Sequence, residues 1–454
     1  MICVPGLQST TIGIYERFYI MNLHRITLAI IMFLCILTAP YVYAVDILNQ
    51  IHPYISLKGE YSDNLNLNAE NQKKDFYTTI SPGIKFSNMD AQSGVTLDAN
   101  AGAVLYNEYT NLNYISGNVN LDSKYLTSSH FNFYLQNSYI RSDDPREREF
   151  FTTTADNKFV LATETQRGVY WRNVVSPTVE YQFGPESRVG VTYRNNVYQT
   201  AAIGSENSME NDVSPFITYW LNSQNGISMS YAYTNGHFET SPDFNGHKAN
   251  ASYMLRFTPK ATATLNGSYT KQEYTVQSVQ YMDYAIYESS LGISYLVSST
   301  LSASAQIGYY WQNREIGQNN NGVTFTADIT QQDARTTYKL SVQGGYTQDF
   351  FTAQNLGFQK YYRATGSITH NLDRKLSIRC LGGVERSESE LASVSDPGRR
   401  ETTWGAGANL SYLPFKWLNF SLEYVYNQRN ANYFYEATNE YKENRGMLTV
   451  TATY

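Results

Sequence analysis

Three things are scarce in this chain: charge, cysteine and long apolar runs. Charged residues make up only 16% of its 454 residues, the net charge is −6, and there is no basic run. These features argue against a nucleic-acid-binding protein. After residue 44 no segment approaches the ~18 apolar residues that a transmembrane helix needs, so we expect none. Of the three cysteines only Cys380 lies outside the N-terminal segment, and we expect no intramolecular disulfide.

Tyrosine and small polar residues are abundant instead. The chain has 40 tyrosines against 21 phenylalanines and five tryptophans, and its mean hydropathy is −0.42. A water-soluble domain of this size would normally carry ~25% charged residues and a more apolar core. Low charge with many Tyr, Asn, Ser and Thr residues is typical of a barrel that has an apolar outer band and a polar interior.

The last strand carries the clearest pattern. Leu448, Val450, Ala452 and the terminal Tyr454 fall on one face of an extended segment, and three threonines alternate with them on the other face. Chain ends usually fray, so an amphipathic strand closed by an aromatic residue is unusual for a soluble protein. We interpret these four residues as the signal that the outer-membrane barrel assembly machinery reads.

The N-terminal segment predicts export. Met21-Asn-Leu-His-Arg25 is followed by an apolar run that ends at Ala39 and by a small-residue site, so we expect a signal peptide cleaved after Ala44. Residues 1–20 do not fit such a leader, and translation from Met21 instead of Met1 is an alternative. We expect one domain, residues 45–454, without a plug domain, because few residues precede the first predicted strand.

Alternating apolar and polar residues recur along the whole chain. They predict an all-β fold, an antiparallel up-and-down transmembrane β-barrel of about twenty strands, with eighteen as the alternative and 322–330 as the least secure strand. The predicted strands are 52–63, 76–87, 94–107, 114–125, 131–142, 169–183, 188–199, 211–221, 227–238, 247–257, 260–274, 282–297, 300–313, 322–330, 335–347, 358–371, 375–387, 402–413, 416–429 and 442–454.

Short and long connections alternate between these strands. Short periplasmic turns and long outer loops are the rule in such barrels, and they place both chain ends in the periplasm. The longest connection, Asp143 to Gly168, is the best candidate for a loop that constricts the lumen. We favour the simpler interpretation, a solvated outer loop.

Strand parity predicts which charges line the lumen. A charge on the lipid face would cost ~2–4 kcal/mol near the bilayer centre, so the charged residues should face inward. They are nearly balanced in sign, which predicts weak ion selectivity. The predicted lumen charges are Lys58, Glu60, Asp98, Asp122, Glu180, Arg194, Lys248, Arg256, Lys339, Arg363, Arg379, Glu385 and Glu423.

Aromatic residues gather near the predicted strand ends, where aromatic girdles form at the two membrane interfaces. A glycan-binding aromatic track is the alternative interpretation. The groups are Tyr219-Trp220, Tyr309-Tyr310-Trp311, Tyr361-Tyr362, Phe415 to Trp417 and Tyr433-Phe434-Tyr435.

Catalytic and metal-binding motifs are missing. We find no G-x-S-x-G, H-E-x-x-H or C-x-x-C pattern and no calcium-loop pattern. We therefore expect no catalytic residues, no metal, no cofactor and no enzyme activity.

Several short motifs resemble the outer-membrane β-barrel porin family. They are Tyr61-Ser-Asp-Asn64, Asp75 and Ser81-Pro-Gly83 near the start. Gly344-Gly-Tyr346, Asn355-Leu-Gly-Phe358 and Tyr441-Lys-Glu-Asn-Arg445 are similar to a branch linked to PEP-CTERM exopolysaccharide systems. At the shared positions we expect Asp63 and Asn64 to end a strand and cap a turn, and Gly83 to relieve crowding.

This resemblance implies an outer-membrane barrel that works with envelope polysaccharides. We expect a porin-like channel for small polar solutes or a secreted polysaccharide. An occluded structural or glycan-binding barrel is the first alternative, and an outer-membrane hydrolase is the second. The expected partners are outer-membrane lipid and lipopolysaccharide, the assembly machinery, and polysaccharide or export components.

Overall fold

The computed structural model describes residues 50–90, 92–127, 130–147, 167–202, 205–277, 282–315, 319–348, 358–389, 399–432 and 440–454. The predicted signal peptide and its cleavage site at Ala44 lie outside these residues. Two short 3-10 helices, η2 (Thr110–Leu112) and η3 (Pro145–Glu147), lie in connections between strands. None of the described helices has the length and apolar character to cross a membrane.

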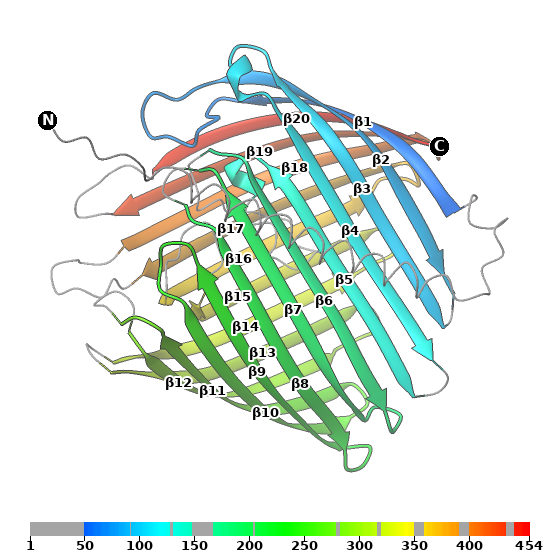
Figure 1. Cartoon of the computed structure of the whole chain (residues 1–454). Helices are drawn as coiled ribbons and strands as arrows, with labels where there is room; N and C mark the ends of the chain where they lie inside the picture. Colours follow the sequence, from blue (N-terminus) through cyan, green and yellow to red (C-terminus); the bar gives the residue numbers. More distant parts are fainter. Residues whose placement is uncertain are drawn as a thin grey trace, which may run out of the picture. The chain divides into compact units, whose positions relative to one another are not determined.

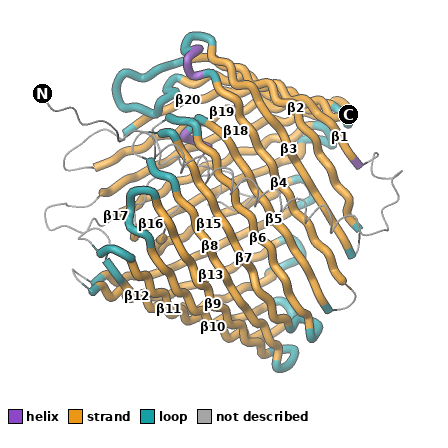
Figure 2. The backbone as a smooth tube through the Cα atoms, viewed as in Figure 1, coloured by secondary structure: helices purple, strands orange, loops and turns teal. Residues whose placement is uncertain are grey.

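Twenty antiparallel strands form the fold, as the sequence predicted (Figures 1 and 2). The uncertain segment 322–330 is a strand, β14. The strands are β1 (Ile51–Ser62), β2 (Asp75–Met89), β3 (Ser93–Tyr106), β4 (Tyr114–Thr127), β5 (Phe131–Ser142), β6 (Tyr170–Gln182), β7 (Arg188–Thr200), β8 (Ser208–Trp220), β9 (Asn225–Phe238), β10 (Phe244–Thr258), β11 (Ala261–Tyr274), β12 (Tyr284–Leu296), β13 (Leu301–Arg314), β14 (Asn320–Gln332), β15 (Thr336–Gln348), β16 (Phe358–Asn371), β17 (Leu376–Ser389), β18 (Arg399–Phe415), β19 (Leu418–Asn432) and β20 (Tyr441–Thr453).

Each strand pairs with the next, and β1 also pairs with β20, so the sheet closes into a barrel. Closure leaves no unpaired edge, which a strand assembly in hydrocarbon requires. The connections after even-numbered strands are turns of two to five residues, and those after odd-numbered strands have five residues or more. We call the two rims the turn end and the loop end.

Strand parity separates the outer wall from the interior. Exposed apolar side chains such as Leu57, Leu291 and Ile307 occupy alternate positions, whereas Glu60 and Tyr310 at the intervening parity are buried. Side chains can be buried this completely only inside the barrel. The apolar outer face is what a lipid-embedded barrel needs.

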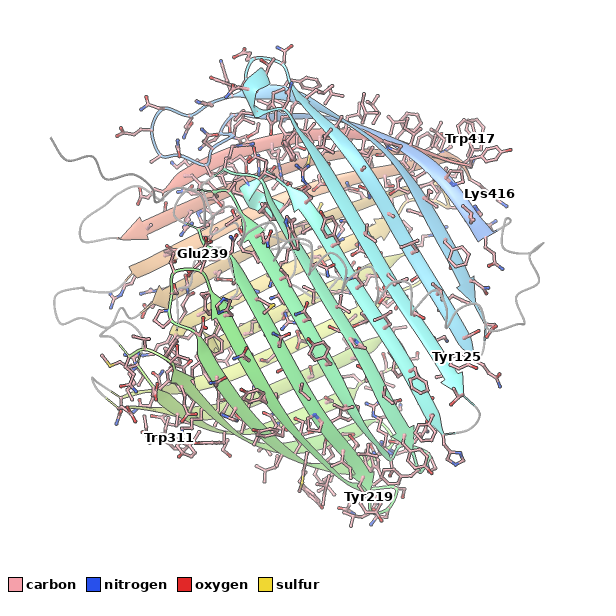
Figure 3. The ribbon with its side chains drawn as sticks, viewed as in Figure 1. Tyr125, Tyr219, Glu239, Trp311, Lys416 and Trp417 are labelled. Atoms are coloured by element: carbon pink, nitrogen blue, oxygen red, sulfur yellow. The ribbon has the colours of Figure 1, made fainter. Side chains whose placement is uncertain are left out.

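Two groups of exposed aromatic side chains border the apolar band. Tyr125 and Tyr219 lie on the outer face near the turn end, and Trp311 lies on it near the loop end (Figure 3). Phe415 and Trp417 are also exposed, and their rings are stacked with centroids 5.6 Å apart.

Three of the residues that we assigned to the aromatic girdles face the interior, so the girdle interpretation is wrong for them. Tyr310 is buried inside the barrel, and strand parity also turns Trp220 and Tyr361 inward. Their exposed neighbours Tyr219 and Tyr362 face outward, because adjacent strand residues point to opposite faces. Residues 433–435 lie outside the described part of the chain.

Side chains reinforce the junction between β1 and β20. Asn444 donates its backbone and its side-chain N–H groups to the two carboxylate oxygens of Asp63, each at 2.7 Å. The Ser62 hydroxyl donates to Glu443 Oε1 at 2.8 Å, and Asn64 Nδ2 donates to the carbonyl oxygen of Lys442 at 2.9 Å. The resembling motifs from the two ends of the chain therefore meet at this seam.

The expected turn role of this motif is also present. Asn64 Oδ1 accepts from the Asn68 backbone N–H at 3.0 Å, and β1 ends at Ser62. A Cβ on Gly83 would lie 2.4 Å from the ring of Tyr54, so glycine relieves crowding at this position.

We predict that Asp63→Ala weakens closure of the barrel. The change removes two hydrogen bonds to a charged acceptor, each worth roughly 1.5–3 kcal/mol. The measurement is urea unfolding of the barrel refolded into lipid vesicles. Asp90→Ala is the matched control, because Asp90 also accepts two backbone N–H groups but lies exposed in a turn. Equal unfolding midpoints for the two variants would contradict a role for Asp63 in closure.

Candidate functional site

The thirteen predicted lumen charges all lie on the inward face, since neighbouring positions on the same strands carry the exposed apolar side chains. They are spread around the barrel and do not form one cluster. On β1, β3, β4, β6 and β7 they are Lys58, Glu60, Asp98, Asp122, Glu180 and Arg194. On β10, β15, β16, β17 and β19 they are Lys248, Arg256, Lys339, Arg363, Arg379, Glu385 and Glu423.

The described residues narrow the lumen at the loop end, next to the β1–β20 seam. We call this region the loop-end constriction. The β1–β2 connection folds inward, so that Leu65 and Leu67 are completely buried. Leu67 adopts a positive φ of 51°, which costs a non-glycine residue roughly 1–2 kcal/mol. Burial of its side chain against Tyr441 offsets this cost.

The start of the longest connection also folds inward. Asp143, Asp144, Pro145 and Arg146 are buried. Our preferred interpretation of this stretch as a solvated loop is therefore wrong for these residues, and the constricting alternative describes them. Residues 148–166 lie outside the description. The composition of this segment did not predict that it folds inward, because its charged side chains pair with residues on strands that are distant in the sequence.

Arg146 is the centre of the constriction. Its Nε lies 2.7 Å from Asp144 Oδ1, and its Nη1 pairs with Glu443 of β20. Glu60 of β1 pairs with Lys58 at 2.8 Å and with Arg445 at 3.4 Å. Buried charges are stable only when they are paired in this way. The ion pairs hold the loop segment against the strand wall.

Arg167 fixes the other end of the same connection. Its Nε donates to the Leu65 carbonyl oxygen at 3.3 Å, and its Nη1 donates to the Tyr106 hydroxyl at 3.1 Å. The rings of Tyr106 and Tyr77 are stacked beneath it, with centroids 4.7 Å apart. Arg167 therefore links the first and third loop-end connections.

Burial and neighbouring charges shift the pKa values of three groups in the constriction. Burial lowers the pKa of Arg146 on its own, but the carboxylates of Asp144 and Glu443 more than offset this and raise it. Burial raises the pKa of Asp144, but the guanidinium groups of Arg146 and Arg167 outweigh it and lower the pKa. Burial and the neighbouring Asp144 raise the pKa of Glu147.

We predict that the constriction loosens as the pH rises through the raised pKa of Glu147. A carboxyl whose folded pKa is raised favours the folded state below its unfolded pKa and loses that contribution at higher pH. Glu147→Gln keeps the shape without the titration, so this variant should not loosen in that window. The measurement is channel conductance against pH. Identical profiles for the wild type and the variant would contradict this role.

A second polar network lines the wall on β6–β8. Arg172 Nε donates to Asn196 Oδ1 at 2.9 Å, and Asn196 donates to Glu210 Oε2 at 3.0 Å. Arg194 pairs with Glu210 Oε1 at 3.1 Å. On the far side of the seam Arg429 and Glu401 form a fully buried pair.

Sequence reasoning missed most of these loop-end charges. Four of them lie at inward parity on predicted strands, so the same rule that found Glu423 would have found Glu443 and Arg445. Glu210 and Glu401 lie one residue before the predicted strands 211–221 and 402–413. They were left out because strand ends are difficult to place from sequence. The missed inward charges that are buried near the loop end are Arg172, Glu210, Glu401, Arg429, Glu443 and Arg445.

The interior wall on β9–β16 is aromatic at the loop end. Phe238, Phe244, Tyr274, Tyr310 and Phe358 belong to one buried cluster. Tyr346 packs against it, with its ring centroid 4.7 Å from that of Tyr310.

A glycine places Tyr346 in this cluster. Tyr338 and Leu340 face outward at even positions of β15, yet Tyr346 at the same parity faces inward. The switch lies at Gly345, whose φ of +155° is accessible mainly to glycine. The resembling motif Gly344-Gly-Tyr346 thus has a structural role.

Carboxylates lie close to two of the described histidines. His237 Nδ1 lies 2.7 Å from Asp243 Oδ2, and Nε2 of the half-buried His247 lies 3.9 Å from Glu273. No serine or cysteine side chain is hydrogen-bonded to either ring within the described ranges. In that same part of the chain no group of His, Cys, Asp or Glu residues is arranged to hold a metal ion.

Comparison with known proteins identifies the fold and not a family. No protein-family model matches the sequence, and no characterised protein is similar to it in sequence. The unliganded ferric citrate transporter FecA is similar in structure, with a TM-score of 0.52, 11% identity and coverage of 89% of this chain and 79% of that one.

Two further solved structures are less similar. The ferric enterobactin receptor PfeA has a TM-score of 0.48 and 9% identity, with coverage of 89% and 81%. The Pseudomonas aeruginosa outer membrane protein OpdK has a TM-score of 0.41 and 12% identity, with coverage of 89% and 99%.

Proposed function

We propose that this protein is an outer-membrane channel that passes small polar solutes. One observation carries the proposal: a closed barrel of twenty strands has an apolar outer face bordered by aromatic residues and an interior lined by charged and polar side chains. Twenty strands enclose more space than the wall side chains fill, so water must enter wherever loops do not. The loop end would then face the cell exterior and the turn end the periplasm.

The finer parts of the proposal rest on the sequence alone. Export through a signal peptide cleaved after Ala44 rests on the leader pattern, and a link to exopolysaccharide production rests on the resembling motifs. Recognition by the assembly machinery would use Leu448, Val450, Ala452 and Tyr454. Leu448 is exposed on the outer face, and Tyr454 donates its backbone N–H to the Pro53 carbonyl oxygen at 2.8 Å. We expect no enzyme activity and no cofactor.

Planar-bilayer conductance of the refolded protein tests the channel. We expect discrete conductance steps that are reduced by sugars small enough to enter the lumen and left unchanged by sugars too large to enter. Esterase, deacylase and protease assays on the same preparation should give no turnover. A refolded barrel without conductance would contradict a passive channel.

The loop-end constriction favours a second candidate, an occluded barrel that binds a glycan or a partner. Buried residues from two connections occupy the interior beside the seam. The two candidates differ in one result. If the wild type is closed but Arg146→Ala conducts, the constriction is a closed gate on a channel. If neither conducts and the protein retains a glycan in a pull-down, the barrel is a binding protein.

A further inference from the structure

We infer that the lumen selects for anions, and that the solutes it passes are small molecules bearing carboxylate or phosphate groups. The inference rests on the proposed channel function and names its substrate class. The nearly equal numbers of positive and negative lumen charges predict weak ion selectivity. A solute, however, interacts mainly with the charges that are exposed to the lumen, and these are mostly positive.

The interior ion pairs are asymmetric in exposure. The basic side chain is exposed to the lumen by 33% in Lys58–Glu60, 53% in Arg188–Glu180 and 40% in Arg194–Glu210, whereas the three carboxylates are exposed by only 1%, 6% and 8%. Arg363–Glu385 follows the same order at 28% and 13%. These pairs lie on β1, β6–β8 and β16–β17. Lys85–Asp98 is closer to even at 53% and 42%, and Arg256–Glu186 at the turn end has the opposite order at 30% and 53%.

Side-chain length explains the asymmetry. A carboxylate sits close to the backbone and is held against the wall, as Glu180 is by Asn132 at 2.7 Å and by Tyr134 at 3.2 Å. Lysine and arginine have long apolar stems that lie along the wall and extend their charged ends toward water. Each neutral pair thus becomes an oriented dipole with its positive end in the lumen.

Carboxylates without a basic partner are also tied back to the wall. Asp212 accepts from Thr234 at 2.9 Å, and Glu288 accepts from Thr324 at 2.8 Å and from Tyr346 at 3.1 Å. Asp122 and Asp328 are exceptions. Asp122 is exposed although it accepts from Gln136 at 3.1 Å. Asp328 is half-buried on the inward face of β14, and no side chain of the described residues is hydrogen-bonded to it.

Lys248 adds a positive charge to the lumen outside the ion pairs. It is exposed on the inward face of β10, and no carboxylate pairs with it among the described residues. Rows of lysine and arginine are how pores select anions, and a narrow charged lumen raises the local concentration of ions of opposite sign. Guanidinium groups, which bind carboxylates and phosphates in a fork, extend the preference to organic anions.

The test is the reversal potential of the reconstituted channel in a tenfold KCl gradient. We expect chloride to be more permeant than potassium. A unit charge acting across roughly 8 Å of water changes the occupancy of a monovalent ion about twofold. The charge attracts chloride and repels potassium, so Lys248→Gln should lower the chloride-to-potassium ratio about fourfold, and Lys248→Arg should preserve it.

The matched control is Lys271→Gln. Lys271 lies on β11 opposite His247, so it is at the height of Lys248 but on the outer face. Its replacement should leave the ratio unchanged. A ratio at or below one in the wild type, or equal shifts for the two Lys→Gln variants, would overturn the inference while leaving the channel in place. A barrel without any conductance would overturn the channel itself, and the anion preference with it.

Discussion

Arg146→Ala should destabilise the barrel by about 3–5 kcal/mol and raise its conductance. Removing one partner of a buried ion pair leaves the other charges uncompensated, and losses of this size follow. Here the carboxylates of Asp144 and Glu443 would stay buried without their guanidinium. The segment 143–147 should then leave the wall and widen the loop end. The measurements are urea unfolding in vesicles and single-channel conductance.

The control for Arg146→Ala lies on the preceding strand. Arg141 is also an arginine near the loop end, but it is only half-buried, and among the described residues its side chain donates to the Ile115 carbonyl oxygen and to no carboxylate. Arg141→Ala should leave both unfolding and conductance close to the wild type. If Arg146→Ala lost stability without any change in conductance, the constriction would be a purely structural brace.

A charge on the outer face should be far more damaging than the same charge inside. Ile307 is 62% exposed on the outer wall in the middle of β13, and Gln306 beside it faces inward. Ile307→Arg should cost about 2–4 kcal/mol, because arginine at mid-bilayer depth is poorly solvated. Gln306→Arg should cost little, since water reaches its side chain in the lumen.

Both variants are measured by refolding into vesicles and urea unfolding, with the same lipid. The two positions are adjacent and receive the same side chain, so the variants differ only in which face of the barrel wall carries the arginine. Equal costs at the two positions would show that the outer wall does not contact hydrocarbon. The membrane assignment and the channel proposal would then both fail.

The alternation of apolar and polar residues predicted the strands because it depends only on which side of the barrel wall each side chain faces. This rule placed Lys58 and Glu423 inward, and the least certain predicted strand, 322–330, is part of β14 (Asn320–Gln332). The same rule gave no warning at Gly345, where one unusual backbone angle reverses the parity and turns Tyr346 into the barrel.

Contacts between distant segments were beyond the reach of the sequence. Asp63 meets Asn444 only because the barrel closes, and their separation along the chain hides the pairing. Arg146 likewise finds Glu443 across the interior. The charges in the Asp143 stretch looked like those of any solvated loop, since their burial depends on where the loop folds.

The sequence by itself determined the architecture of this protein: the strand number, the alternation of turns and loops, and the inward direction of thirteen charged side chains. These follow from the local alternation between hydrocarbon and water. Only the tertiary structure decided how those charges are used. Side-chain reach leaves lysines and arginines accessible and their carboxylates covered, and chain closure brings the loop segments together beside the seam. Both depend on distances between segments that no local pattern encodes.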